Sequence, residues 1–123
     1  MKFKEFLKKK DVNISAKAYF LDALGAMAFG LFASLLMGTI FTTLGDKLNL
    51  PILLEIAKYA KQATGAAIGV AIAFSLKAPS LVLFSATVCG IAGNALGGPV
   101  GAYIATVIST ELGKIVSKET KVD

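Results

Sequence analysis

The sequence predicts an all-α integral membrane protein with four hydrophobic helical segments, the last two forming a hairpin broken at Gly97-Gly98-Pro99. Apolar residues make up 55% of the chain and its mean hydropathy is +0.71, well above the balance of a soluble domain. Residues 78–110 carry no formal charge, and as one helix they would extend about 50 Å, against a hydrocarbon core of roughly 30 Å. Because glycine and proline weaken helix, we expect this run to fold back at the tripeptide.

The first hydrophobic segment follows a basic start. Phe3, Phe6 and Leu7 share a helical face among lysines, which suits a short helix at the level of the lipid headgroups; a frayed basic tail is the alternative. With Ser15 as N-cap, a continuous helix is expected from about Ala16 to Leu44, and the turn Gly45-Asp46-Lys47 should close it. The expected divisions of the chain are a basic amphipathic segment, a transmembrane helical domain and a charged tail, at residues 1–21, 22–116 and 117–123.

The second hydrophobic segment has two different halves. Pro51 suits the first position of a helix, and residues 52–76 are expected to form one tilted helix. Its first half carries a stripe of charge, so that end should lie at the membrane surface or face a polar cavity; the stripe consists of Glu55, Lys58 and Lys61.

The charged residues exclude several classes of function. All 13 basic residues are lysines and there is no histidine, so guanidinium clamps and imidazole chemistry are absent. No phosphate-binding loop, zinc spacing or nucleophile–base pair occurs, so neither an enzyme nor a cofactor is expected. The net charge is +5, and the lysines stand beside apolar spans. Attraction to anionic lipid headgroups explains these lysines better than binding of nucleic acid does. Cys89 stands alone and is expected to be a packing residue.

Small residues recur every fourth position in the first segment, at Ala26, Gly30, Ser34 and Gly38. Such grooves let spanning helices approach closely where lipid supplies no hydrophobic drive. The pattern predicts helix association, either within a homo-oligomer or with further parts of a longer transporter.

The candidate site lies at the predicted break. Helix-weakening residues are dense between positions 90 and 101, and Asn94 is the nearest polar side chain. Interrupted backbone at membrane depth is tolerated only inside protein or beside a water-filled cavity, and transporters use such breaks to bind substrate. The predicted substrate-binding residues are therefore Asn94, Gly97, Gly98 and Pro99, with no metal; a surface turn between two ordinary spans is the alternative.

Two carboxylates stand at the edges of the apolar runs. Asp22 and Glu111 are expected at the membrane interface, and proton coupling is the alternative role.

Several stretches form a recognisable set along the chain. They include Asp22-Ala23-Leu24-Gly25-Ala26, Gly65-Ala66-Ala67-Ile68-Gly69, Gly97-Gly98-Pro99-Val100-Gly101-Ala102 and Lys118-Glu119-Thr120-Lys121-Val122-Asp123. Together they resemble the N-terminal part of phosphotransferase-system EIIC-type membrane proteins, including the PfoR-like proteins. The resemblance covers nearly the whole chain and implies sugar uptake across the bacterial cytoplasmic membrane by a multi-pass protein, of which this chain would be the first portion.

Two other function classes remain open at the level of sequence. Gly97-Gly98-Pro99-Val100-Gly101-Ala102 is similar to an element of small four-helix fluoride channels, although the arginine that follows that element there is missing here. A small oligomeric ion channel, or a regulatory or holin-like membrane protein without a solute pathway, is therefore the alternative to a transporter of a small solute such as a sugar.

We predict that both termini are cytoplasmic, because lysines cluster at both ends and four crossings return the chain to its starting side. A reporter that is active only in the cytoplasm, fused to either end, should be active in both fusions. An active N-terminal fusion beside an inactive C-terminal one would contradict the even number of crossings.

Overall fold

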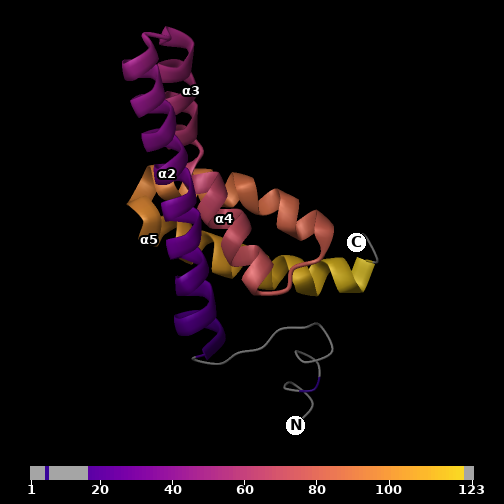
Figure 1. The fold of residues 1–123 in the computed structure, drawn as a ribbon. Helices are drawn as coiled ribbons and strands as arrows, with labels where there is room; N and C mark the ends of the chain where they lie inside the picture. Colours follow the sequence, from indigo (N-terminus) through magenta and orange to yellow (C-terminus); the bar gives the residue numbers. More distant parts are fainter. Residues whose placement is uncertain (1–4, 6–16, 121–123) are drawn as a thin grey trace.

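The computed structural model of the chain describes Glu5 and residues 17–120, with side chains placed as far as Val116. This part of the chain is helical, without strands, and two of its helices are long and apolar enough to cross a membrane: Lys17–Leu48 and Ser80–Val116. Most of the expected interfacial helix at the N-terminus, the Ser15 cap predicted for the first spanning helix and residues 121–123 of the charged tail lie outside the described residues. The elements are η1 (Lys17–Ala23), α2 (Leu24–Leu48), α3 (Pro51–Gln62), α4 (Thr64–Ser75) and α5 (Ser80–Thr120) (Figure 1).

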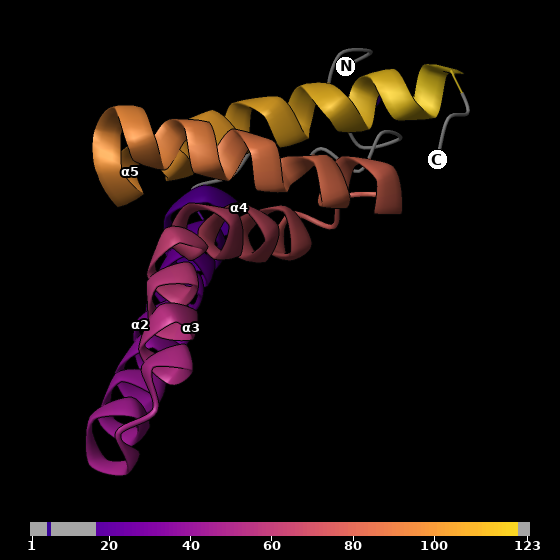
Figure 2. The same ribbon diagram turned by 90° about the horizontal axis from the view of Figure 1, so that it is seen from above.

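The helices form two groups that run across each other. α3 returns along α2, so the two make an antiparallel pair, while α4 packs against α5 (Figures 1 and 2). α2 also packs on α4, so α4 lies between the pair and α5. Short apolar α4 is thus the element that both groups share.

α2 ends four residues later than the sequence predicts. Gly45 lies within the helix, and the chain turns instead at Asn49, which is left-handed at φ 52° and donates its N–H to the Gly45 carbonyl. Asparagine tolerates that conformation. Gly45 is needed for packing, because a Cβ there would lie 2.8 Å from Leu54 Cδ2 of α3.

The predicted single helix at 52–76 is wrong: it is two helices separated at Ala63. Just beyond the separation, the Thr64 hydroxyl donates to the Lys61 carbonyl at 2.8 Å and accepts from Ser34 of α2 at 3.0 Å. Side-chain bonds of this kind compete with the helical backbone pattern and bend helices. The charged half therefore follows α2 and the apolar half turns toward α5.

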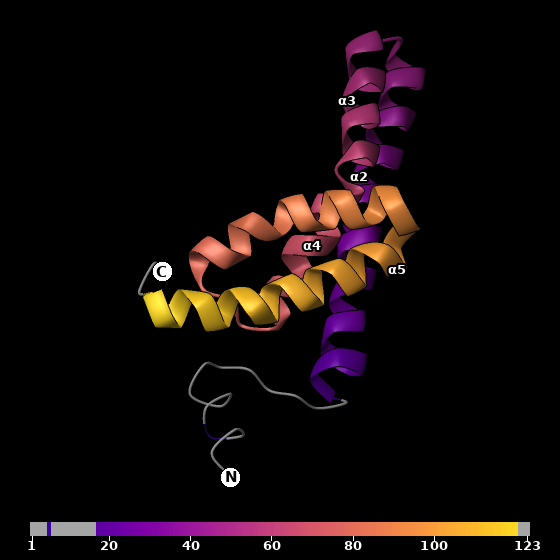
Figure 3. The same cartoon turned by 180° about the vertical axis from the view of Figure 1, so that it is seen from behind.

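α5 is interrupted at Gly97 (φ −146°, ψ 19°) and Gly98 (φ 68°, ψ −164°), where its backbone is not helical. The arms on either side of this interruption lie next to each other (Figure 3). Gly93 of the first arm faces Gly101 of the second so closely that a Cβ on Gly93 would lie 2.5 Å from the Gly101 carbonyl oxygen. Pro99 begins the second arm, where its missing N–H costs least.

Glycines bring α4 into backbone contact with both of its neighbours. A Cβ on Gly65 would lie 2.6 Å from the Gly90 carbonyl oxygen of α5, and one on Gly30 of α2 would lie 2.7 Å from the Ala67 carbonyl oxygen and the Ile68 Cα. Ile68 is fully buried at this crossing. The small-residue face of α2 is therefore a helix-packing surface within the chain.

Gly30→Ala should destabilise the chain by about 1–3 kcal/mol, because the new methyl group has only backbone to displace. Gly25→Ala on the same helix is the matched control: a Cβ there has no atom within 4 Å, and higher helix propensity should stabilise by about 0.5–1 kcal/mol. Denaturant unfolding in detergent, followed by circular dichroism, measures both. Equal stabilities would show that α2 does not pack on α4 through Gly30.

The larger substitution Gly38→Leu should be milder than Gly30→Leu, although the sequence pattern treats the two glycines alike. A Cβ on Gly38 would meet Lys61 Cγ at an ordinary 3.5 Å, and the end of a lysine side chain can move.

Candidate functional site

The predicted site residues lie where α5 bends. Asn94 is half-buried against α4, its Cβ 2.9 Å from where a Cβ on Gly65 would be. Gly97 is exposed, Gly98 and Pro99 are half-buried, and a Cβ on either glycine would have no atom within 4 Å. The structure thus brings Asn94 onto α4 and leaves open space around the two glycines.

A partly buried polar cluster that the sequence analysis did not identify lies along the second arm of α5. Tyr19 of η1 donates its phenol hydroxyl to Glu111 Oε2 at 2.7 Å, and Tyr103 donates to the Tyr19 carbonyl at 2.6 Å. Lys114 Nζ lies 2.9 Å from Glu111 Oε1 and donates to the Leu76 carbonyl at 2.7 Å. The Oε1–Nζ contact lacks hydrogen-bond geometry and is an ion pair. The cluster joins η1, α4 and α5.

Lys114 sits at the negative end of a helix. α4 ends in a turn in which Lys77 is left-handed (φ 61°), the Ala78 N–H bonds to the Ala73 carbonyl and the Lys77 N–H bonds to the Phe74 carbonyl. This leaves the Leu76 carbonyl for the Lys114 ammonium, which also complements the helix dipole. Lys114 is only 1% exposed, because a carbonyl and a carboxylate replace its hydration.

The pairing of Glu111 with Lys114 was detectable in the sequence, since residues three apart share a helix face. The contact of Glu111 with Tyr19 was not, because nothing local relates residues that stand so far apart. Glu111 was expected to be interfacial, yet its side chain is 14% exposed and pairs within the protein.

Two buried threonines lie on the same arm of α5, on the N-terminal side of Lys114. Thr106 and Thr110 are 0% and 1% exposed, and their hydroxyls have no hydrogen-bond partner among the described residues. By contrast, Ser109 on the same arm donates to the Ala105 carbonyl at 2.7 Å. Buried hydroxyls without a partner are rare and costly, so this pair of threonines is an unusual feature of the arm.

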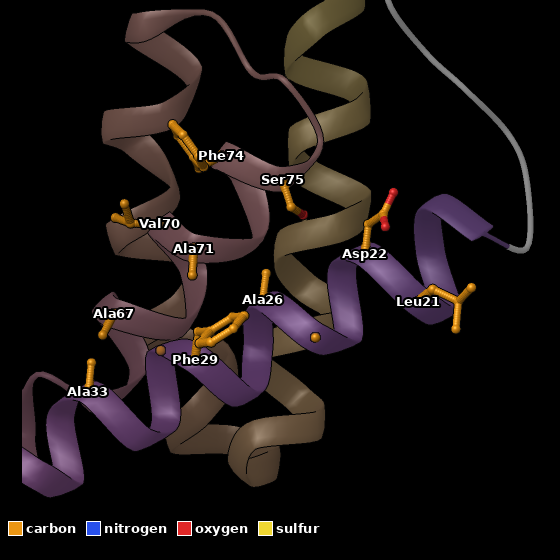
Figure 4. A pocket seen from close by; sticks show the side chains of 12 residues that line it. Leu21, Asp22, Ala26, Phe29, Ala33, Ala67, Val70, Ala71, Phe74 and Ser75 are labelled. Atoms are coloured by element: carbon orange, nitrogen blue, oxygen red, sulfur yellow. The ribbon is translucent and has the colours of Figure 1, made fainter.

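An open groove of about 790 Å³ runs between the η1–α2 helix and α4 (Figure 4). Its walls are mostly apolar and include Phe29 and Phe74. Asp22 of η1 and Ser75 of α4 are its polar side chains, and Ser75 donates to the Ile72 carbonyl at 2.8 Å. Among the residues that the structure describes, no group of three or more His, Cys, Asp or Glu is placed to hold a metal ion.

The two helices that are long and apolar enough to cross a membrane point to a membrane-integral helical protein. Residues 21–123 match the family described as "Phosphotransferase system, EIIC", and the chain belongs to that family. This identifies it as a protein of sugar transport in the phosphotransferase system. Comparisons with curated proteins and with solved structures gave no match.

Replacing Glu111 with leucine should destabilise the chain by about 3–5 kcal/mol, because the buried Lys114 ammonium loses its counter-charge. The double variant Glu111→Leu with Lys114→Met should lose less than the single variant, since no unpaired charge remains. Denaturant unfolding in detergent measures the two losses. A double variant that is less stable than the single one would contradict this prediction, because Lys114 would then stabilise the chain through the Leu76 carbonyl without its counter-charge.

Proposed function

We propose that the chain is a membrane-embedded portion of a sugar permease, and that the interruption of α5 at Gly97 and Gly98 contributes to the solute pathway together with Asn94 and Pro99. The observation that carries the proposal is the backbone of Gly98. Its dihedral angles, φ 68° and ψ −164°, lie in a region that is essentially restricted to glycine. Such a conformation inside an otherwise apolar helix is a reason to look for function there.

The chemistry of the interruption suits a sugar. Where the helix is broken, backbone N–H and C=O groups leave the helical pattern and become available to a ligand. The Asn94 amide adds a donor and an acceptor, which are the groups that bind sugar hydroxyls. Open space around Gly97 and Gly98 leaves room for contact with a ligand or with another part of the transporter.

In the membrane, we propose four apolar segments between residues 22 and 116, with the arms of α5 as the terminal hairpin and both chain ends in the cytoplasm of a bacterium. The lysines at both ends support this orientation. A second copy or the remainder of a longer PfoR-like transporter would complete the pathway. Membership of the EIIC family favours this proposal over an ion channel or a holin-like protein.

Asn94→Cys, in a Cys89→Ala background and in proteoliposomes, should react with a small water-soluble thiol reagent and resist a bulky one. The reason is that a polar cavity at the break admits water but not a large molecule. A panel of mono- and disaccharides should include at least one sugar that slows the reaction. Mass spectrometry of the labelled protein gives the rates.

Two glycine variants provide matched controls. Gly98→Ala forces alanine into a left-handed conformation, at a cost of about 1–3 kcal/mol, and should abolish the protection by sugar. Gly97→Ala has a negative φ and open space, so it adds a methyl group without backbone strain and should reduce protection less than Gly98→Ala does. Equal reactivity of position 94 with both reagents would indicate an exposed turn, and inertness to both would indicate dry packing; either result would contradict the proposed site.

A further inference from the structure

Tyr19 connects η1 to α5 by two hydrogen bonds, one through its side chain and one through its backbone. Its phenol hydroxyl bonds to Glu111, and its backbone carbonyl accepts from Tyr103, both on the second arm. One residue of η1 is therefore held on α5 by a charge-assisted bond and by a neutral bond, which differ in strength.

The backbone of η1 provides an alternative state. Lys17–Ala23 is a π-helix that continues directly into α-helical α2. π-Helical turns are rare, usually occur as single turns and are frequent at functional sites. Without the two contacts of Tyr19, the α-helical form that follows in the same helix is the default for this segment.

The same cluster connects η1 to the end of α4. From Tyr19 the contacts pass through Glu111 and Lys114 to the Leu76 carbonyl. The groove is bounded at this end by Leu21 and Asp22 of η1, just after Tyr19 in the chain, and by Ser75 of α4, just before Leu76 (Figure 4). Both walls of this end of the groove are thus attached to one polar cluster.

The cluster also adjoins groups that the observed arrangement leaves unsatisfied. The buried hydroxyls of Thr106 and Thr110 lie on the arm that carries Tyr103, Glu111 and Lys114, and they have no partner among the described residues. Each such hydroxyl opposes the closed packing of this arm, because water or a shifted backbone would satisfy it. The bond between Tyr19 and Glu111 stabilises the closed packing, and the unsatisfied threonine hydroxyls destabilise it. Opposing contributions of this kind suit an element that has two arrangements.

We propose that Tyr19 is a latch that holds η1 in the π-helical form against α5, and that its release widens the groove between η1 and α4. In the latched state Tyr19 bonds to Glu111 and accepts from Tyr103. In the released state η1 adopts the α-helical form of α2, and Leu21 moves away from Phe74. The proposal does not depend on where the sugar binds.

Spin labels test the latch directly. Leu21→Cys and Phe74→Cys, in a Cys89→Ala background, place labels on opposite walls of the groove at side chains that are 68% and 74% exposed. Pulsed electron resonance on the chain in proteoliposomes gives the distribution of distances between the labels. The labelled chain with native Tyr19 should show one dominant distance.

Tyr19→Phe keeps the ring and removes the bond to Glu111, so the population at longer distances should rise about tenfold. Tyr103→Phe removes the neutral bond to the Tyr19 carbonyl and should produce a smaller rise, and the double variant should produce the largest. Tyr59→Phe is the matched control, because Tyr59 lies on α3 and is 65% exposed.

Distance distributions of Tyr19→Phe and Tyr103→Phe that equal that of Tyr59→Phe would overturn the latch. A general loss of helix in Tyr19→Phe, measured by far-UV circular dichroism, would also overturn it, because Tyr19 would then support the fold rather than the width of the groove. A rise in the long-distance population with unchanged helix content supports the proposal.

Discussion

Contact between helix backbones at glycine is the constraint on which the rest of the structure depends. α4 has only 12 residues, yet it packs against both α2 and α5. At each of these contacts a glycine lacks the Cβ that would separate the backbones: Gly30 on α2, Gly65 on α4 and Gly90 on α5. In apolar surroundings, where burial supplies little drive, such proximity provides the dispersion contacts and weak hydrogen bonds that hold helices together.

Glycine contacts alone leave the register of α4 open, because a smooth backbone groove also fits after a shift of one turn. Polar bonds near its two ends fix that register. Near its start, Ser34 of α2 donates to Thr64 at 3.0 Å, and just beyond its end the Leu76 carbonyl accepts from Lys114 of α5. A one-turn shift would break both bonds and leave a buried ammonium without one of its partners. The position of α4, and with it the shape of the groove, therefore rests on these two bonds.

The sequence predicted the features that arise from local physics. Helical segments follow from the apolar runs, and the interruption in α5 falls at Gly97 and Gly98, where the residue types themselves oppose helix. The separation at Ala63 was missed because alanine favours helix; the bend comes from the Thr64 hydroxyl and its bond to another helix. Gly45 was taken as a turn residue, although it serves close packing. A glycine in the sequence indicates a position where a Cβ is unfavourable. Whether the backbone conformation or a neighbouring helix excludes the Cβ can be seen only in the folded chain.

The candidate site also combines features that the sequence predicts with one that it does not. The break was predicted from residue type, and a site at Asn94 stays a prediction, whereas the position of Lys114 depends on the Leu76 carbonyl at the end of another helix and on Glu111. A lysine near the end of an apolar run is expected at the interface, because exposing it to water is the simplest way to satisfy its charge. Burial became favourable only because the end of α4 presents a carbonyl beside Glu111, and this juxtaposition is a property of the folded chain.

The crossing of α2 over α5 restricts how both can lie in one bilayer. Helices that run across each other cannot both follow the membrane normal (Figures 1 and 2). The first arm of α5, residues 80–96, extends about 26 Å and has no length to spare for a core of roughly 30 Å. The Lys17–Leu48 helix has 32 residues and extends about 48 Å, which still crosses the core at a steep tilt. If the first arm of α5 spans the core, it must therefore stay close to the membrane normal, and only the Lys17–Leu48 helix has length for a tilted crossing.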